Sequence, residues 1–417
     1  MTRLPRRPAR PTVDLPVARL LPLLAALTAL GPLSIDVYTP SLPAMQAELG
    51  GSDALTQASI TTFLLGIGVG QLFWGPLSDR VGRRPVILLG VGGWALACLL
   101  AAFAVAPGML VAVRLLAGLC AAAGIAVARS VVRDVSTTRA ETASRIGLLS
   151  MVTALAPVVA PLLGAGIAAL WGWRADFVAM AAIGGAIVLL YAWQVPETLP
   201  VGRREPGGVA TVAGALAGAA RDRELAGVAA LMAVHSFGFY AYISTAAFVV
   251  ERELGHPPAV FALVFGTNAL AVIAGNQVFR RLVRRRHPAT PLGVGLVVCT
   301  AGGALLAVGA SLGAPDPMLW AASLAYAFGQ GLVLPGTHSW AQATAVTSGA
   351  ASALAGAAQF LGGVLGSPVT GLLGPGSLEL GVVLAVASGA AAVIWTLTRR
   401  RVDDRLDAPH RNTTKET

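Results

Sequence analysis

The chain has 417 residues, of which 55% are hydrophobic and only 12% are charged, and its mean hydropathy is +0.72. Soluble globular proteins contain about 25% charged residues, so this composition excludes a soluble protein and indicates that lipid covers most of the apolar surface. The net charge of +10 does not indicate nucleic acid binding, because the basic residues are spread between apolar runs instead of forming one basic face or tail.

Twelve apolar segments are long enough to cross a bilayer, which takes about 20 residues in a helix. The first follows an arginine-rich arm and could pass for a signal peptide. No small-residue cleavage site follows it and eleven more segments do, so we interpret it as an uncleaved helix. The predicted spans are 18–40, 56–75, 86–105, 108–129, 145–168, 174–195, 226–249, 259–279, 290–311, 317–338, 351–372 and 378–398.

Segment 196–225 separates two blocks of six spans. It contains Pro196, Pro200, Pro206 and a Gly-Gly pair, a composition typical of a linker. We therefore predict an all-α membrane protein with twelve transmembrane helices in two six-helix halves. Its predicted parts are an N-terminal arm (1–17), an N-terminal half (18–195), a central loop (196–225), a C-terminal half (226–398) and a tail (399–417).

Basic residues are concentrated on one side of the predicted membrane. Of the 30 Lys and Arg residues, all but Arg114, Arg174 and Arg252 belong to the arm, the tail or the loops on their side. Loops rich in Lys and Arg stay in the cytoplasm. This distribution predicts that both termini are cytoplasmic.

Asp36 is an acidic residue inside an apolar span, and Glu379 stands at the start of the last span. An ionised carboxylate at a helix centre costs about 2.5–3.5 kcal/mol on insertion scales. Asp36 is therefore our first candidate for a functional residue. Pro32, Pro40 and Pro43 remove backbone donors, which is tolerated where the helix faces protein or a wet cavity. The alternative is that the first helix ends early and that Asp36 lies in the outer headgroup layer.

Arg114 is the basic residue that lies inside a span, and it is followed at helical spacing by the small residues Gly118 and Ala121. It is a second candidate, although a long side chain near a helix end can also extend to the headgroups. If Arg114 and Asp36 share a cavity, the arginine favours the ionised carboxylate whereas burial disfavours it. Proton binding and substrate binding would then compete for the same charge.

A charged turn is predicted between the second and third spans, at residues 75–85. Gly75, Gly82 and Pro85 bend the chain, and four charges stand at the membrane surface, unless they serve only as a solvated topological cluster. The residues are Asp79, Arg80, Arg83 and Arg84.

The span 145–168 contains Pro157 and Pro161, four residues apart, followed by Gly164 and Gly166. This pattern predicts a kinked helix with a close-packing face.

Other polar or aromatic residues inside the spans are candidates for the wall of a cavity, and each could equally form a bond between helices. They are His235, Phe239, Tyr242, Asn268, Gln330 and Gln359. The cysteines Cys98, Cys120 and Cys299 stand alone without metal-ligand spacing, so we expect neither a metal site nor a cofactor.

The run 75–85 resembles the signature loop of the major facilitator superfamily, G-x-L-[SA]-D-R-x-G-R-[RK]. Residues 33–43 (LSIDVYTPSLP) and 197–199 (ETL) resemble the Bcr/CflA-type drug:proton antiporters of that superfamily. The likeness is good across the first half and thin in the second. It implies two rocking six-helix halves with a substrate site near the membrane midplane, and it adds Tyr38 to the cavity candidates.

The resemblance also implies roles for single residues. Arg114 and Gly118 are similar to the R-x-x-x-G element of such antiporters. The span 145–168 is similar to their antiporter motif, although alanines replace several of its glycines. In the signature loop, Asp79 is expected to face the start of the span 351–372, near 348–352, and Arg83 to pair with Asp134. These contacts would latch the cytoplasmic side shut in the outward-open state.

The predicted function is therefore proton-driven export of small, mostly apolar antibiotics of the chloramphenicol or bicyclomycin kind, by a monomer in the bacterial cell membrane. An importer or an exporter of another metabolite is the alternative within transport. A receptor or scaffold role does not explain the paired six-span blocks with a lone buried acid. A membrane-embedded enzyme is disfavoured, because the spans hold no acid/base or metal cluster. The sequence contains no nucleotide-binding loop of the G-x-x-x-x-G-K-[ST] type, so coupling to ATP is not expected.

Overall fold

A computed structural model describes the chain except for residues 1–16, 205–213, 215–216, 219–220, 345–347 and 408–417. All regular structure in the described residues is helical. Eleven described helices are long and apolar enough to cross a membrane, by length and composition. The helix α13 (Ser348–Gly366), with 19 residues, corresponds to the predicted span 351–372.

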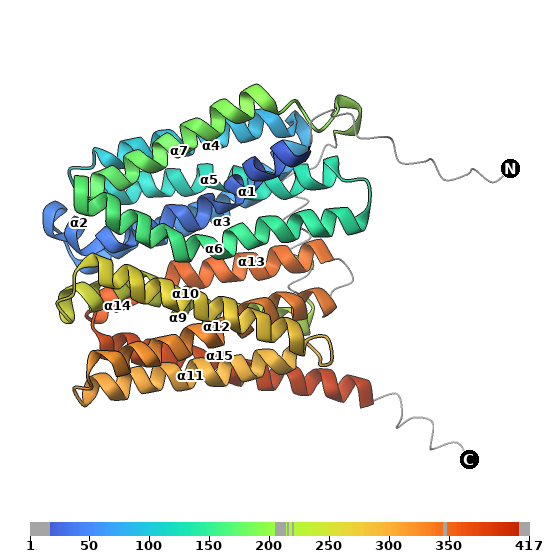
Figure 1. The fold of residues 1–417 in the computed structure, drawn as a ribbon. Helices are drawn as coiled ribbons and strands as arrows, with labels where there is room; N and C mark the ends of the chain where they lie inside the picture. The colour runs from blue at the N-terminus through green and yellow to red at the C-terminus, as the bar shows by residue number, and fades with distance from the viewer. Residues whose placement is uncertain (1–16, 205–213, 215–216, 219–220, 345–347, 408–417) are drawn as a thin grey trace, which may run out of the picture.

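The helices form two halves that lie side by side, with the described ends of α1 and α15 on the same face, called here the terminal face (Figure 1). The N-terminal half contains α1 (Val17–Asp36), η1 (Thr39–Ser41), α2 (Leu42–Leu49), α3 (Asp53–Val81), α4 (Arg83–Ala102), α5 (Pro107–Val135), α6 (Arg139–Trp171) and α7 (Trp173–Gln194), followed by η2 (Val201–Arg203). The C-terminal half contains α9 (Arg223–Ala247), η3 (Phe248–Glu253), α10 (Pro258–Leu282), α11 (Ala289–Ser311), α12 (Asp316–Thr344), α13, α14 (Val369–Leu373) and α15 (Ser377–Asp407).

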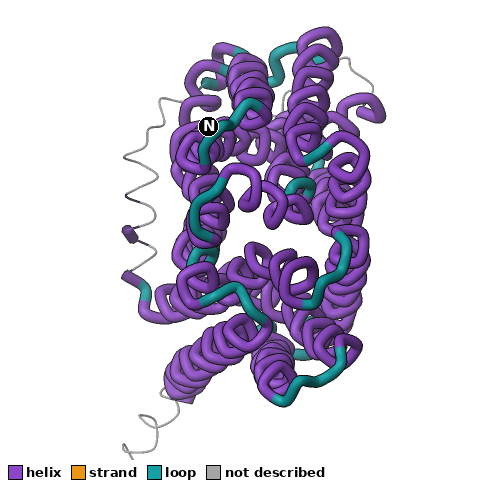
Figure 2. Tube along the Cα trace, turned by 90° about the vertical axis from the view of Figure 1, so that its left-hand side faces the viewer, coloured by secondary structure: helices purple, strands orange, loops and turns teal. Residues whose placement is uncertain are grey.

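The packing of the first half is repeated in the second. In the N-terminal half α3 and α4 pack on α5, α4 packs on α7, and α1 packs on α6. In the C-terminal half α10 and α11 pack on α12, α11 packs on α15, and α9 packs on α13. The contacts between halves match in the same way, since α6 meets α10 and α13 meets α3. Figure 2, seen from the face opposite the termini, shows the two groups of helices one above the other.

The first predicted span, 18–40, is interrupted rather than continuous. The α-helix ends at Asp36, and the chain continues through η1 and α2 to the opposite face. Pro40 and Pro43 lack the backbone N–H that a continuing helix needs. Residues Leu20–Leu49 together are long and apolar enough for one crossing of 30 residues, and Asp36 stands near the middle of that segment.

The predicted turn at 75–85 is wrong in extent. Helix α3 continues to Val81 and α4 begins at Arg83, so Gly82 alone makes the turn. Its φ of +110° is open to glycine and strained for other residues. Pro85 is the third residue of α4, where the backbone N–H has no helical partner in any case. Pro76 removes one hydrogen bond inside α3 without ending it.

Candidate functional site

A cavity of about 440 Å³ lies between the two halves. Its lining includes Thr28, Gly31, Pro32, Ile35 and Asp36 from α1, Leu64 and Ile67 from α3, Ile125 and Arg129 from α5, and Thr153 and Pro157 from α6. The other wall includes Phe239, Tyr240, Tyr242 and Ile243 from α9, Phe265, Asn268 and Asn276 from α10, Tyr326 and Gln330 from α12, and Gln359 and Phe360 from α13. A cavity of this size suits a small organic molecule.

Asp36 stands on the wall of this cavity with 4% of its surface exposed. Among the described residues no hydrogen-bond or ion-pair partner of its carboxyl group is found. Tyr240 from the other half also lines the cavity and lies close enough to interact with Asp36 electrostatically. A carboxyl group with no cation beside it is one that can change its protonation state as its access to water changes.

The two walls differ in chemistry. All the aromatic rings and all the amide side chains that line the cavity come from the C-terminal half, whereas both charged residues, Asp36 and Arg129, come from the N-terminal half. Asn268 donates to the Tyr242 hydroxyl (2.5 Å), and Gln330 donates to the Tyr326 hydroxyl (2.9 Å). These bonds fix the rings and amides in the helices that present them, so this wall is preorganised for a mostly apolar ligand that carries a few polar groups.

The structure sorts the predicted cavity candidates into two groups. Phe239, Tyr242, Asn268, Gln330 and Gln359 line the cavity. Tyr38 and His235 do not, because both are fully buried within their own halves: Tyr38 bonds to Ser59 (3.0 Å) and His235 to Gln330 (2.7 Å).

Sequence reasoning missed several residues of the wall, namely Tyr240, Phe265, Tyr326, Phe360, Arg129 and Asn276. The rings carry no signal of their own in an apolar helix, since Phe and Tyr face lipid and cavities alike. Arg129 stands at the end of the predicted span 108–129, where a basic residue is ordinary. Asn276 stands four residues before the pair Arg280 and Arg281, so in the sequence it is also interpreted as part of a helix end.

Arg114 lies behind the cavity wall, fully buried in the N-terminal half. Its guanidinium is held between the rings of Tyr38 and Phe63, at 4.7 and 4.1 Å from their centroids, and donates to the Ser34 carbonyl oxygen (2.6 Å). That carbonyl belongs to the last turn of α1, where the helix dipole favours a cation. Arg114 therefore contacts the helix end that presents Asp36, and not the carboxyl group itself.

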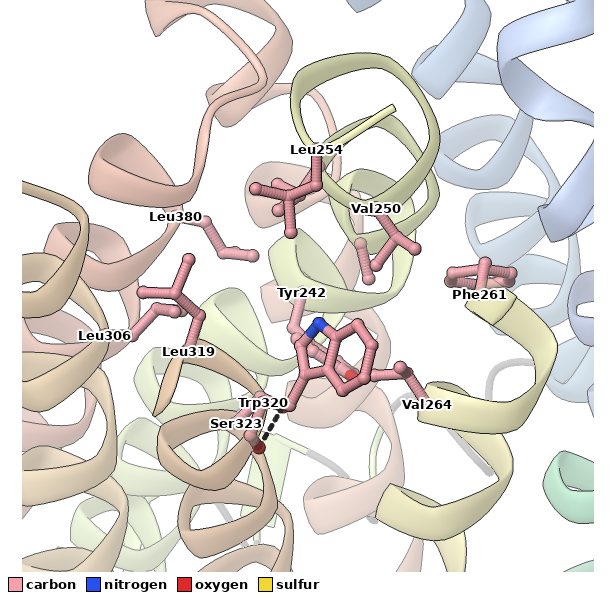
Figure 3. Close-up of a pocket in the computed structure, with 12 residues that line it drawn as sticks. Tyr242, Val250, Leu254, Phe261, Val264, Leu306, Leu319, Trp320, Ser323 and Leu380 are labelled. Carbon is pink, nitrogen blue, oxygen red and sulfur yellow. Dashed lines mark hydrogen bonds between the residues drawn. The ribbon is translucent and has the colours of Figure 1, made fainter. Parts of the chain in front are cut away.

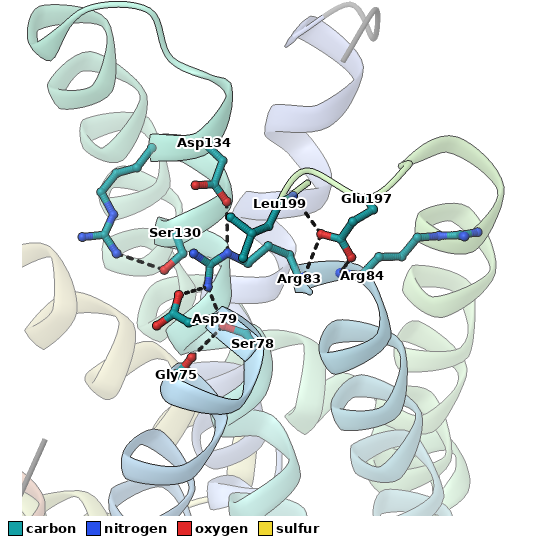
Figure 4. Close-up of polar contacts among 10 residues, drawn as sticks. Gly75, Ser78, Asp79, Arg83, Arg84, Ser130, Asp134, Glu197 and Leu199 are labelled. Carbon is teal, nitrogen blue, oxygen red and sulfur yellow. Dashed lines mark hydrogen bonds and ion pairs between the residues drawn. The ribbon is translucent and has the colours of Figure 1, made fainter. Parts of the chain in front are cut away.

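Arg83 joins two acidic residues at the terminal face (Figure 4). Its guanidinium pairs with Asp79 of α3 (2.6 Å) and Asp134 of α5 (3.0 Å), and also donates to Ser78 (2.6 Å). The pair with Asp134 has the geometry that the resemblance implies. The expected contact of Asp79 with 348–352 falls on side chains outside the described residues.

Glu197 connects the segment after α7 to the same loop (Figure 4). Its carboxylate accepts the backbone N–H groups of Arg83 (2.9 Å) and Arg84 (3.1 Å), the first two residues of α4. Glu197 thus fills the anion-binding end of a helix. A side chain on Gly82 would overlap this carboxylate and displace it, in addition to the strain that the φ of Gly82 imposes on other residues.

We expect Glu197→Gln to weaken this junction without changing the fold. The neutral amide keeps one acceptor but loses the charge-assisted bonds and the interaction with the helix dipole, about 1–3 kcal/mol. Thermal unfolding of the purified protein in detergent should shift down by several degrees. Glu379→Gln, which removes a carboxylate on the opposite face, is the matched control, and an equal shift in both variants would contradict the assignment.

Contacts between the halves close the cavity toward the opposite face. The buried Gln57 of α3 accepts the Gly371 backbone N–H at its side-chain oxygen (3.0 Å) and the Ser367 hydroxyl at its backbone oxygen (3.3 Å). Nearer the surface, Arg252 pairs with Asp53 (2.6 Å). The outer pair is partly exposed and contributes little, so the buried amide contacts are the main closure.

A second cavity lies inside the C-terminal half, bordered by η3, α10 and α12 (Figure 3). Its lining is almost wholly apolar and includes Val250, Phe261, Leu319 and Trp320. At about 30 Å³ it has room for about one water molecule. It is too small to be a substrate site.

In α6, Pro157 lines the cavity, and Gly164 packs directly on the chain after α1. A side chain at Gly164 would overlap the Val37 carbonyl oxygen, whereas one at Gly166 would meet nothing within 4 Å. The close-packing face predicted for this helix therefore includes Gly164 and not Gly166. No group of His, Cys, Asp and Glu in the described part of the chain is arranged to hold a metal ion.

Residues 24–367 match the family model of the Major Facilitator Superfamily. The chain is 34% identical over 384 residues, 91% of this chain and 95% of the relative, to the uncharacterized MFS-type transporter YdgK of Bacillus subtilis (strain 168). It is 28% identical over 393 residues, 92% of this chain and 96% of the relative, to the bicyclomycin resistance protein homolog of Haemophilus influenzae. Its fold matches, with a TM-score of 0.73 and 19% identity over 92% of this chain and 97% of the other, the crystal structure of a bacterial homolog to the human lysosomal transporter Spinster in an inward-facing and occupied conformation. The chain therefore belongs to the Major Facilitator Superfamily.

Proposed function

We propose that this transporter is a proton-coupled exporter of small, mostly apolar antibiotics, acting as a monomer in the bacterial cell membrane with both termini in the cytoplasm. The observation that carries the proposal is the lone carboxyl group of Asp36 on the wall of the cavity between the halves. The bicyclomycin resistance protein homolog, similar over almost the whole chain, supports the substrate class.

The geometry supports a cycle of alternating access. With the opposite face closed by Gln57, the cavity belongs to an inward-facing state in which drug enters from the cytoplasm. Rocking of the halves would break the contacts of Gln57 and expose Asp36 to the outside, where it takes up a proton as the drug leaves. The neutral carboxyl then permits the return, because burying an uncharged group costs far less than burying an ion.

Arg83 and Glu197 have a mechanical role in this proposal. Arg83 ties α3 to α5 and Glu197 ties α4 to the central loop, so the terminal ends of the N-terminal half move as one body. Arg114 has a positioning role, since it holds the last turn of α1 and with it Asp36. Neither the rings nor the amides of the C-terminal half can carry the proton, which leaves them for drug recognition.

The proposed function predicts energy-dependent exclusion of drug from cells. Cells that express the protein should accumulate less chloramphenicol than cells with an empty vector, and an uncoupler should abolish the difference. Each proton that enters releases about 2.3 kcal/mol of free energy per 100 mV of membrane potential, which can sustain roughly a fifty-fold drug gradient. Accumulation above the control in energised cells would instead indicate the alternative, a proton-coupled importer, and an uncoupler-insensitive difference would contradict proton coupling.

A further inference from the structure

Asp176 is a second buried carboxyl group, and it lies outside the cavity. It belongs to the first turn of α7, near the face opposite the termini, and none of its surface is exposed. The predicted span 174–195 had placed it at a helix end, where hydropathy gives no reason to single it out. Burial of a carboxyl group at such a depth is costly unless it is paired or neutral.

The partners of Asp176 do not neutralise it. Its Oδ2 accepts the Ser41 hydroxyl (2.6 Å), and its buried Oδ1 has no hydrogen-bond partner. Arg174 is the basic residue nearest in sequence, but it pairs with Glu48 and stacks on Trp173. Arg114 donates to the Ser34 carbonyl oxygen and lies between the rings of Tyr38 and Phe63, and it forms no ion pair with Asp176. In the described part of the chain no cation pairs with Asp176.

The position of Asp176 links it to the segment that carries Asp36. Ser41 is the last residue of η1, the short helix that follows the end of α1 at Asp36. The neighbouring Phe177 ring lies 5.2 Å from that of Tyr38 in the same segment. The first turn of α7 therefore packs on this segment through one polar and one aromatic contact. A change of charge at Asp176 would act on the part of the chain that presents Asp36.

We propose that Asp176 is a second proton-binding site of the transporter, loaded from the outside when the opposite face opens and in contact with the segment that presents Asp36. Only a proton is transferred: it binds a carboxylate oxygen of Asp176 in the outward-facing state, and it is released to the cytoplasmic side in the inward-facing state before the next proton binds. The proposal rests on the proposed function, since it assumes proton-driven transport. It predicts two protons per drug molecule, one for each carboxyl group.

The test uses the full chain in proteoliposomes, in which potassium and valinomycin set the membrane potential and a fixed gradient of chloramphenicol opposes the proton gradient. The potential at which net drug movement stops gives the number of protons per drug. The wild type should give two, and Asp176→Asn should give one. At 100 mV the variant would then sustain a drug gradient about fifty-fold smaller than the wild type.

Ser41→Ala is the matched control, because it removes the hydrogen bond to Asp176 but leaves both carboxyl groups. It should still give two protons per drug, as should Asp176→Glu. An unchanged number in Asp176→Asn would overturn the second site and leave the proposed function intact. Movement of drug in the wild type without any dependence on the proton gradient would overturn both.

An infrared spectrum provides a measurement that needs no transport. The purified wild type, titrated with acid, should gain carboxylic-acid carbonyl absorption from a buried group that Asp176→Asn lacks. If Asp176→Asn does not fold, Asp176→Glu is measured instead. The frequency of the carbonyl band should then differ between the wild type and Asp176→Glu, because the longer side chain places the carboxyl group in a different environment. Identical spectra for wild type and the variant measured would overturn the proposal.

Discussion

Replacement of Asp36 with Asn is expected to abolish uphill drug export while drug exchange continues. Asn has the size of a protonated Asp and cannot ionise, so the variant resembles the proton-loaded carrier at every step. The cavity wall keeps its shape, because no described residue bonds to the Asp36 carboxyl group. The variant can neither bind nor release a proton at this position, so it loses the roughly fifty-fold drug gradient that one proton sustains at 100 mV.

Two assays on the same proteoliposomes separate these effects. Drug accumulation against an imposed proton gradient should fall to the level of empty vesicles, whereas exchange of labelled for unlabelled drug at equal concentrations should proceed at a rate near that of the wild type. Glu379→Gln serves as the control for neutralising a carboxylate far from the cavity and should keep both activities. Gradient-driven accumulation by Asp36→Asn would remove Asp36 as the proton site.

The fold was predictable because the apolar composition of each span identifies it as a membrane helix. Lipid imposes long apolar helices, so the series of spans and their division into two halves follow from hydropathy and from the linker between them. Breaks within the spans were harder to predict. The extent of the turn at Gly82 depends on one residue with positive φ, and the end of α1 at Asp36 depends on prolines several residues later.

The site was predictable only where a residue conflicts with its surroundings. Asp36 stands out because a charge in an apolar run is expensive, but Tyr240 and Phe360 are unremarkable in a membrane helix and gain meaning only from the cavity they share. Asp176 was missed for a related reason. It stands three residues from the start of α7, where a sequence cannot distinguish a headgroup contact from a buried carboxyl group.

Gly164→Ala is expected to disrupt the N-terminal half, although alanine is normally the better helix former by about 1 kcal/mol. The new methyl group would overlap the Val37 carbonyl oxygen, which is backbone and cannot rotate away. Helix α6 must therefore move off the end of α1, and the loss of packing there costs at least about 1–3 kcal/mol. The displaced segment includes Asp36, so transport should fall together with stability.

Gly166→Ala, two residues along the same helix, tests whether this effect is specific to the contact. Its methyl group would meet nothing within 4 Å, so only the gain in helix propensity remains, and the unfolding temperature in detergent should stay the same or rise slightly. Gly164→Ala should unfold several degrees lower and give less folded protein in the membrane fraction. Equal behaviour of the two variants would mean that α6 does not approach Val37 closely, and the interrupted first helix would then lose its support from α6.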